Sequence, residues 1–278
     1  MKYFFEKLRE GMVFHYLAGA LTGTVSVVDP HRSATRYRFP AISKRVVKRA
    51  RRMAIKEPGT VNWIESDVRD GDVFYDIGAN IGIYSLLAAA RIGAGKVYSF
   101  EPDASSFAGL LQVITLNGLA GRITPLCLAL DAKAGRQTFS YRELIVASTG
   151  SQLSSSPVQV DAGYYPVEIK FTQSVDGLIA ARALPSPDLV KIDVDGNEMN
   201  ILRGMSDLLQ RRTVRSLQVE VDPQWQEPIY KFMEEAGYRL TSAFRSRQIA
   251  RQYQDDAVRD HIHNAVFEPI NGPAVVCD

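Results

Sequence analysis

The residues best suited to chemistry follow a short apolar segment, Val73–Ile77, whose composition is that of a strand buried on both faces. Asp76, Gly78 and Asn80 stand at alternate positions at its end, where a dinucleotide-binding turn would carry G-x-G-x-x-G. The aspartate takes the place of the first glycine, and a carboxylate there repels phosphate and attracts a cation. The pattern therefore favours S-adenosylmethionine, which carries an ammonium and a sulfonium, over NAD.

A second acidic residue supports an adenosyl cofactor. Lys96–Phe100 has the pattern of the next strand and is followed by Glu101. A carboxylate at the tip of the second strand commonly holds a ribose diol through two hydrogen bonds. The third predicted strand, Arg122–Leu130, ends in the same way at Asp131. We therefore expect Glu101 and Asp131 to join Asp76, Gly78 and Asn80 in binding the cofactor.

A denser acidic segment, Asp193 to Glu198, follows the fourth predicted strand, 188–193. It gathers four acids or amides within six residues, which costs free energy unless the groups are used. We expect Asp193 to lie beside the sulfonium, where it would contact the cofactor and act as the catalytic base, and Glu198 to share the catalytic role. Both have a structural alternative, because carboxylates at these positions often cap the next helix.

Two other groupings could take part in the same chemistry. Asp193, Glu220 and Asp222 follow neighbouring predicted strands and offer the oxygen ligands that Mg²⁺ prefers. Like-charged strand ends alone do not define a ligand set, so no metal residue is predicted. His261 and His263 alternate before the last predicted strand and offer a base above the cleft, although such histidines are more often surface or hydrogen-bonded residues.

The elements that must position these residues alternate between strand and helix from Asp72 onward, which predicts a parallel sheet with helical crossovers. Further strands are expected at 215–222, 238–244 and 265–270. Residues 136–170 are rich in serine, glycine and valine. We expect a β-hairpin insertion there rather than another crossover helix.

The first 56 residues form a predicted N-terminal extension with a basic segment. Residues 2–20 are predicted to form a helix, and Thr22–Asp29 and Arg36–Phe39 a β-hairpin. Lys44–Lys56 carries seven basic residues and no acid, with apolar side chains on one helical face. It is either a surface helix with its cations in water or a docking face for an anionic membrane surface or a polyanionic acceptor.

The composition of the 278 residues, 46% hydrophobic and 23% charged, is that of an ordinary globular protein. The net charge of +2 is too small to argue for a nucleic-acid partner. Two cysteines make no disulfide framework, no segment has the length of a membrane span, and the N-terminus is charged too early for a signal peptide. We expect a cytoplasmic protein in which residues 57–278 form the cofactor-binding domain and residues 1–56 its extension.

Three motifs together resemble the FkbM family of S-adenosylmethionine-dependent methyltransferases. They are Asp-Ile-Gly-Ala-Asn-Ile-Gly at 76–82, Ser-Phe-Glu-Pro at 99–102 and Lys-Ile-Asp-Val-Asp-Gly-Asn-Glu at 191–198. The resemblance implies an α/β, Rossmann-like class I methyltransferase sheet of seven strands in the order 3-2-1-4-5-7-6, with the seventh strand antiparallel. It also implies that the first two motifs bind the cofactor and that the third forms the acidic cleft motif. Asp195 stands where the family more often has glutamate, which keeps the charge and shortens the reach.

The resemblance further implies O-methylation of a hydroxyl, and the expected acceptor is a sugar, a glycan or a natural product. Three alternatives stay open from the sequence. The first is a non-catalytic module that binds the cofactor, and the second is a nucleotide-dependent oxidoreductase, which Asp76 disfavours. The third is an RNA methyltransferase, for which the basic segment argues, whereas no Asn/Asp-Pro-Pro-Tyr tetrad for a flipped base is present.

Overall fold

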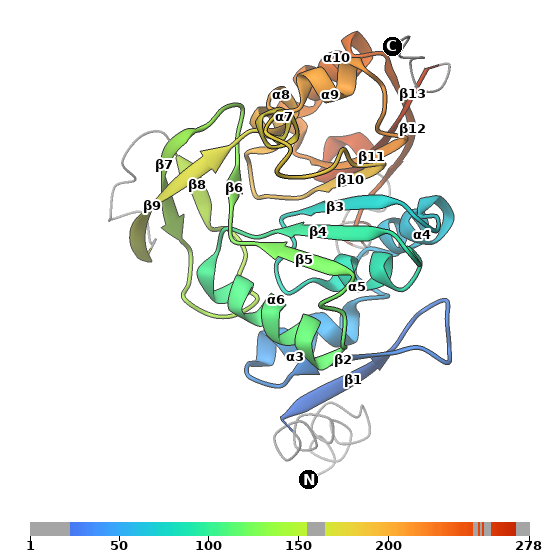
Figure 1. Cartoon of the computed structure of the whole chain (residues 1–278), viewed down its shortest axis with the longest axis vertical. Helices are drawn as coiled ribbons and strands as arrows, with labels where there is room; N and C mark the ends of the chain where they lie inside the picture. Colours follow the sequence, from blue (N-terminus) through green and yellow to red (C-terminus); the bar gives the residue numbers. More distant parts are fainter. Residues whose placement is uncertain (1–22, 155–164, 247–249, 251, 253–256, 271–278) are drawn as a thin grey trace.

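The computed structural model describes residues 23–154, 165–246, 250, 252 and 257–270. Its main sheet has seven strands in the order β5-β4-β3-β10-β11-β13-β12 (Figure 1). With β3 counted as the first strand, this is the predicted order 3-2-1-4-5-7-6, and β13 is antiparallel to both of its neighbours. The strands are β3 (Val73–Ile77), β4 (Lys96–Phe100), β5 (Ile123–Leu126), β10 (Leu189–Ile192), β11 (Ser216–Val221), β12 (Tyr238–Phe244) and β13 (His263–Pro269).

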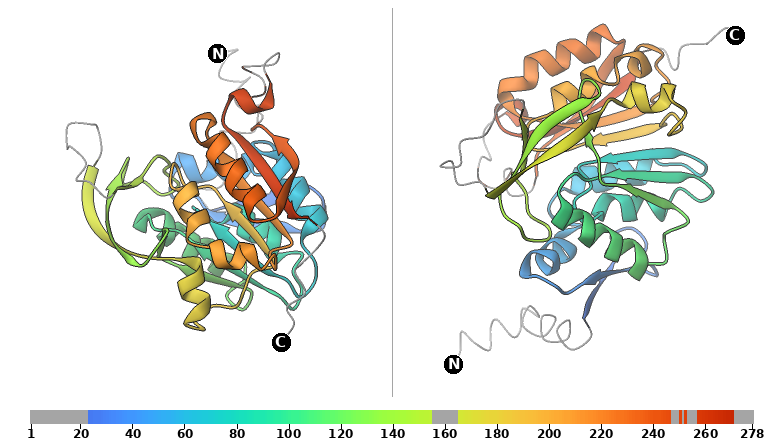
Figure 2. Two further views of the ribbon diagram at one scale, coloured as in Figure 1. Left: turned by 90° about the horizontal axis from the view of Figure 1, so that it is seen from above. Right: turned by 60° about the vertical axis from the view of Figure 1, so that its left-hand side comes forward.

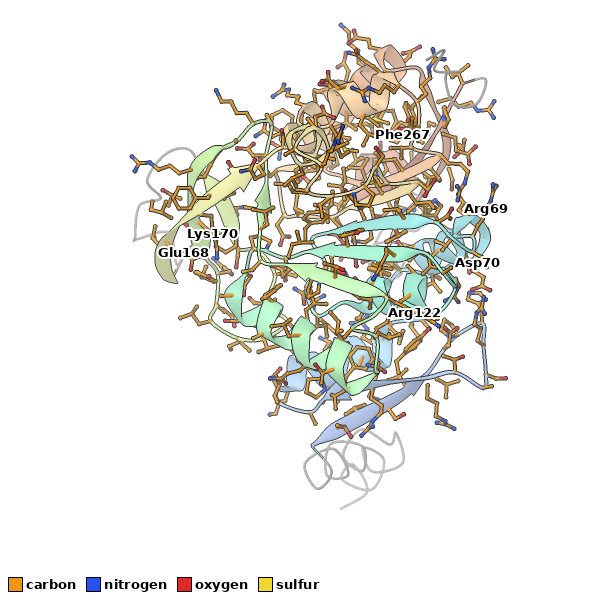
Figure 3. All side chains as sticks on the ribbon, in the orientation of Figure 1. Arg69, Asp70, Arg122, Glu168, Lys170 and Phe267 are labelled. Carbon is orange, nitrogen blue, oxygen red and sulfur yellow. The ribbon has the colours of Figure 1, made fainter. Side chains whose placement is uncertain are left out.

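Helices cover both faces of this sheet, and successive strand residues alternate between the two faces. Phe74 packs in the core cluster on one face, and Tyr75 packs in the cluster on the other. The first face is covered by α4 (Pro58–Asp67), α5 (Ile83–Ala89) and α6 (Ala104–Leu116). The second face is covered by α7 (Val175–Ala180), α8 (Glu198–Arg203), α9 (Ser206–Gln210) and α10 (Gln226–Glu235). Phe267 of β13 packs in this second cluster and is labelled in Figure 3.

The insertion forms a second sheet in the order β6-β9-β7-β8, which confirms a β structure where the hairpin was predicted. Its strands are β6 (Ala129–Leu130), β7 (Gly135–Tyr141), β8 (Gln152–Ser154) and β9 (Tyr165–Gln173). This sheet curves away from the main sheet (Figure 2). The single third strand predicted over 122–130 is wrong, because the chain breaks between β5 and β6. Leu126 is paired with Phe100, the last residue of β4, so the chain beyond it has no partner in the main sheet and pairs with β9 instead.

The N-terminal hairpin is confirmed as β1 (Thr24–Val28) and β2 (Arg36–Pro40). The basic segment forms α3 (Lys44–Arg52), whose first turn is capped by the Ser43 side chain accepting from the Val46 amide. Phe39 and Val46 are fully buried in the same core cluster as the first face of the main sheet. The helix predicted for residues 2–20 lies outside the described residues.

The boundary between extension and domain at residue 56 stays a prediction. Within the described ranges, no helix has both the length and the apolar character needed to cross a bilayer.

Candidate active site

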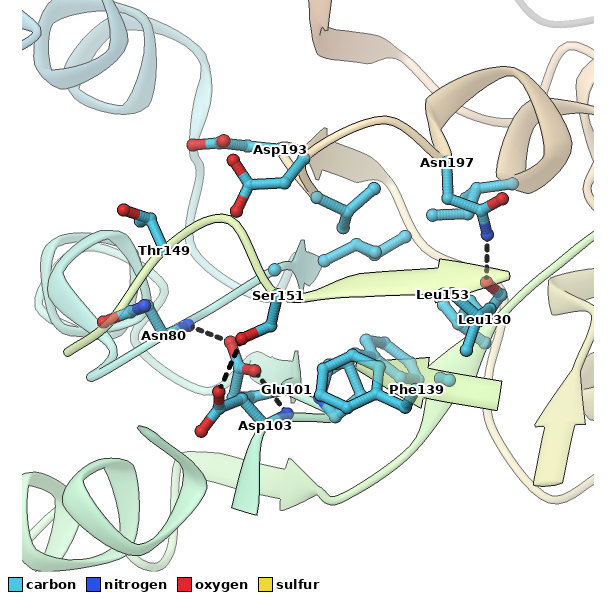
Figure 4. A pocket seen from close by; sticks show the side chains of 18 of the residues that line it. Asn80, Glu101, Asp103, Leu130, Phe139, Thr149, Ser151, Leu153, Asp193 and Asn197 are labelled. Atoms are coloured by element: carbon cyan, nitrogen blue, oxygen red, sulfur yellow. Dashed lines mark hydrogen bonds between the residues drawn. The ribbon is translucent and has the colours of Figure 1, made fainter. Parts of the chain in front are cut away.

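A cavity lies where β3, β4 and β10 end, and the second sheet forms its outer wall (Figure 4). One side is apolar, with Leu130, Phe139 and Leu153 from the second sheet. The polar and acidic part of the lining comes from the turns that follow the main strands: Asn80, Glu101, Asp103, Asp193 and Asp195. An apolar slot beside a carboxylate floor suits a flat heterocycle that is joined to hydroxyl groups.

The turn between β3 and α5 brings backbone close to this cavity. The amides of Gly78 and Ala79 both donate to the Phe100 carbonyl at 3.0 Å, which ties the turn to the end of β4. Gly78 has a φ of +80°, and a Cβ on it would lie 1.8 Å from the Asp193 carbonyl oxygen. Only glycine therefore allows the turn to lie this close to the end of β10.

Glu101 is held rigidly at the edge of this turn. Its two carboxylate oxygens accept from the amides of Asn80 and Asp103, both at 2.7 Å (Figure 4). Only 6% of the residue is exposed. Burial raises the pKa of Glu101 from its ordinary 4.5 to about 8, against the two amide hydrogen bonds that favour the charged form. The group is thus fixed in place, and in its ionised form it is a strong acceptor for a further hydroxyl donor.

Asp193 follows β10 and faces the cavity from the opposite side (Figure 4). Its carboxylate lies 3.1 Å from the Lys191 ammonium, and its side chain is 26% exposed. Burial favours the neutral acid, but the charges of Lys191 and Lys56 outweigh it and hold the pKa of Asp193 below its usual range. The group is therefore an ionised acceptor at neutral pH.

A loop from the second sheet closes over the polar side of the cavity through three hydrogen bonds. The Asn80 side chain donates to the Ser148 carbonyl at 2.6 Å. The Gly150 amide donates to Asp195 at 2.7 Å, and the Ser151 hydroxyl donates to Asp103 at 3.1 Å. The shorter aspartate at 195 thus contacts this loop, as well as lining the cavity.

Residues 76–240, more than half of the chain, match the Methyltransferase FkbM domain family. The chain belongs to the FkbM methyltransferase family. It is accordingly an S-adenosylmethionine-dependent methyltransferase, which confirms the predicted enzyme class and cofactor. The strand order seen here is the order that the resemblance implied for this family.

Two curated relatives carry named activities. The chain is 26% identical over 182 residues to the hexuronic acid methyltransferase AglP of Haloferax volcanii, covering 65% of this chain and 69% of the relative. It is 27% identical over 161 residues to the 31-O-demethyl-FK506 methyltransferase FkbM of Streptomyces tacrolimicus, covering 51% and 62%. The second relative is therefore spanned over less than two thirds of its length.

Solved structures show similarity at low identity. The precorrin-6y C5,15-methyltransferase of Geobacter metallireducens matches at a TM-score of 0.46 and 11% identity, covering 77% of this chain and 86% of that one. An S-adenosylmethionine-dependent methyltransferase of Aquifex aeolicus matches at 0.43 and 11%, covering 79% and 93%.

Asp76 does not line the cavity of this FkbM methyltransferase, although the cofactor inference depended on this residue. It is fully buried, and its carboxylate accepts from Ser85 at 2.6 Å and lies 3.7 Å from the Lys191 ammonium. The cause is the strand register, which places Asp76 directly beside Lys191 on the face that α5 covers. The expectation that this carboxylate meets the sulfonium is wrong, because its charge is balanced inside the protein.

Lys191 connects this buried aspartate to the cavity, and we expect Lys191→Met to destabilise the protein by about 3–5 kcal/mol. Its ammonium is buried between Asp76 and Asp193 and lies 4.9 Å from the centre of the Tyr84 ring. Removing it leaves Asp76 without a counter-charge and Asp193 with only the charges of Lys56 and Arg49. Urea unfolding measures the change, with Lys96→Met on β4 of the same sheet as control, because that amine bonds to an exposed carbonyl. Equal losses in the two variants would contradict this role.

Glu198, predicted to be catalytic, lies outside the cofactor cavity and borders a neighbouring one. Its carboxylate accepts from the amides of Val194 and Gly196 at 3.2 and 3.1 Å. It therefore holds the turn that carries Asp193 in shape, which is the structural alternative rather than the catalytic one.

Asp131 is also placed outside the cavity, although Ala129 and Leu130 line it. Its carboxylate accepts from the Ala132 amide and from the Gln137 side chain, so it closes the turn between β6 and β7. The split of the third predicted strand is the reason, since Asp131 ends a strand of the second sheet instead of the main one.

The geometry does not support the metal-site hypothesis or the histidine-base hypothesis. Within the described ranges no three His, Cys, Asp or Glu side chains gather as a metal site would require, so Asp193, Glu220 and Asp222 do not form a ligand set. His263 is buried, with one ring nitrogen 2.8 Å from the Tyr230 hydroxyl and the other 2.8 Å from the His261 carbonyl. Its hydrogen bonds are structural.

Sequence reasoning missed several residues of the site. Arg49 and Lys56 belong to the basic segment, whose charge was evident but whose position beside Asp193 was not. Phe139, Thr149 and Ser151 lie in the insertion, where no motif marks them.

The raised pKa of Glu101 leads to a testable linkage between protons and cofactor. We expect S-adenosylhomocysteine binding at neutral pH to release up to about one proton, because ribose hydroxyls donate to the ionised carboxylate while the free carboxyl is largely protonated below about pH 8. Affinity should therefore rise as the pH increases toward 8. Titration calorimetry in two buffers of different ionisation enthalpy measures the released protons. Proton uptake on binding would contradict this assignment.

The raised pKa of Glu101 also determines how the stability of the ligand-free protein changes with pH. Because the folded pKa exceeds the ordinary 4.5, the folded state holds more protons between pH 4.5 and about 8, and stability falls as the pH rises through that window.

Proposed function

We propose that this methyltransferase transfers the methyl group of S-adenosylmethionine to a hydroxyl of a sugar, glycan or natural product. The observation that carries the proposal is the position of the ionised Asp193 carboxylate, which borders both the cofactor cavity and a second cavity beside it. The names of the relatives support the acceptor class, since one is named a hexuronic acid methyltransferase and the other a 31-O-demethyl-FK506 methyltransferase. Location in the cytoplasm stays a prediction from the sequence.

The residues present fit the cofactor. Glu101 offers carboxylate oxygens to the ribose hydroxyls, and Phe139 and Leu130 offer an apolar surface to the adenine. Arg49 and Lys56 border the same cavity beside Asp193 and suit the carboxylate of the methionine part. When bound, the cofactor supplies a methyl group on a positively charged sulfur.

Asp193 is assigned the role of receiving the acceptor hydroxyl. Its carboxylate accepts the hydroxyl hydrogen bond, orients the oxygen and takes its proton as the new bond forms. Lys191 keeps the carboxylate ionised, because the ammonium lies 3.1 Å from it and is itself out of solvent. A low pKa makes Asp193 a weak base, so positioning is the larger part of this role.

The experiment combines binding and transfer. S-adenosylhomocysteine should bind in calorimetry, and radiolabelled methyl should pass from the cofactor to glycans or small metabolites extracted from the producing cells. An O-methyl ether resists alkali, whereas a methyl ester is hydrolysed. Alkali-labile label would overturn hydroxyl methylation, ribonuclease-sensitive label would assign an RNA substrate, and binding without any transfer would favour the non-catalytic module.

A further inference from the structure

Helix α3 carries a stripe of four cations along one face. Arg45, Lys48, Arg49 and Arg52 follow the spacing i, i+3, i+4, i+7, which places them on one side of the helix. The opposite side, with Val46, Val47 and Ala50, is buried in the core. All four cations line the second cavity mentioned above, here called the basic cavity, which lies between α3, the β3–α5 turn and the loop at 142–149.

The basic cavity holds more positive than negative side chains. The basic ones are Arg45, Lys48, Arg49, Arg52, Lys56 and Arg142, and the acidic ones are Glu143 and Asp193.

Both acids already have partners, since Glu143 pairs with Arg45 at 2.7 Å and Asp193 with Lys191 at 3.1 Å. The side chains of Lys48 and Arg52 have no hydrogen-bond or ionic partner among the described residues. Like charges three and four residues apart repel one another in a helix. The stripe is therefore arranged to meet an anion.

The basic cavity continues into the cofactor cavity. Residues common to both are Arg49, Lys56, Gly78, Asn80, Thr149 and Asp193. Arg49 and Lys56 stand at this junction and suit the cofactor's own carboxylate. Lys48 and Arg52 border the basic cavity without reaching the cofactor cavity. Their charge is thus left for a second anion, in the part of the basic cavity outside the cofactor cavity.

We infer that the acceptor carries an anionic group, a carboxylate or a phosphate, which Lys48 and Arg52 bind while the hydroxyl to be methylated contacts Asp193. This inference rests on the proposed function and narrows its substrate class. An acceptor site fits better than a membrane-docking face, because the stripe lines a concave cavity. In addition, the Arg49 guanidinium donates to the Ala147 carbonyl at 3.0 Å. This side chain therefore points toward the loop at 142–149, which lines the basic cavity.

The first test separates acceptors by charge. The cell extract is divided on an anion-exchange resin at neutral pH, and each fraction is incubated with the intact enzyme and radiolabelled cofactor. Label in the retained, anionic fraction is expected. Label in the neutral fraction alone would overturn this inference and leave the proposed methyltransfer intact, whereas label in neither would count against the proposed function itself.

The second test uses a matched pair of variants on the same helix. Lys48→Gln/Arg52→Gln should lower the transfer rate onto a limiting amount of the anionic fraction by about tenfold or more. Lys44→Gln, an exposed change in α3 outside the basic cavity, should leave that rate unchanged. S-adenosylhomocysteine affinity should be the same in wild type and both variants. Equal rates in the two variants would overturn the role of Lys48 and Arg52.

Two treatments identify the anion and exclude a membrane. Loss of acceptor activity after phosphatase assigns a phosphate, and loss only after carbodiimide amidation assigns a carboxylate. Sedimentation with vesicles of anionic phospholipid is measured for both variants. If Lys48→Gln/Arg52→Gln loses vesicle binding while its transfer rate equals that of Lys44→Gln, the stripe belongs to a membrane surface and the inference is wrong.

Discussion

Glu101→Ala is expected to weaken S-adenosylhomocysteine binding by about 100-fold or more, because two hydrogen bonds from hydroxyls to a charged carboxylate contribute about 1.5–3 kcal/mol each. The carboxylate is positioned before ligand arrives, since the amides of Asn80 and Asp103 hold its two oxygens. Binding therefore requires the loss of its proton but no movement of this group. Titration calorimetry measures the change.

Two controls separate this contact from a general loosening of the turn. Asp131→Asn changes an acid that follows β6 of the second sheet and lies outside the cavity, and it should bind S-adenosylhomocysteine like the wild type. The 2′-deoxy analogue should bind the wild type more weakly than S-adenosylhomocysteine does, and Glu101→Ala should bind both alike. A Glu101→Ala protein that still discriminates between the two ligands would show that another group holds the ribose.

Asp193→Asn is expected to lower kcat by about 10²- to 10³-fold, within the range that a positioned proton acceptor contributes. The asparagine keeps the size of the side chain and loses the charge that accepts the hydroxyl proton. Cofactor affinity should change little, since Glu101 and the apolar wall are untouched. Single-turnover transfer from labelled cofactor separates the chemical step from product release.

The control for this variant is Asp222→Asn, a carboxylate at the end of the next strand that accepts from the Gln224 amide. Its kcat should stay within about threefold of wild type, as expected for a surface cap. Because Asp193 also faces Lys191, thermal melting of both variants is needed to confirm that the folded state persists. Full turnover by folded Asp193→Asn would remove the residue from the proposed mechanism.

The fold was predictable because its evidence is local. The alternation of apolar strands with helical segments predicted a parallel sheet with helical crossovers. Glu101, the acid after β4, was expected at the cavity for a simple reason. The chain leaves the sheet at Phe100, so the next residue lies at the strand tip whatever the rest of the fold does. Glu101 is found there, with its carboxylate facing the cavity.

Asp76 shows where local evidence ends. It precedes the last residue of β3, so its side chain points to one face of the sheet, and its environment there is Lys191 on β10, far along the chain. A carboxylate next to a glycine-bearing turn looks the same in sequence whether it faces solvent or a buried ammonium. The cofactor prediction was correct, but its electrostatic reason was not.

The sequence by itself determined the strands, the family and the position of Glu101, because period-two burial, strand ends and short motifs are properties of neighbouring residues. The strand order came with the resemblance to the family. Only the tertiary structure decided that Asp76 is buried beside Lys191, that Asp131 leaves the site with the second sheet, and that four cations of α3 line one cavity with Asp193. Each of these depends on contacts between segments distant in the chain. Their pairing follows from packing, and no local pattern records it.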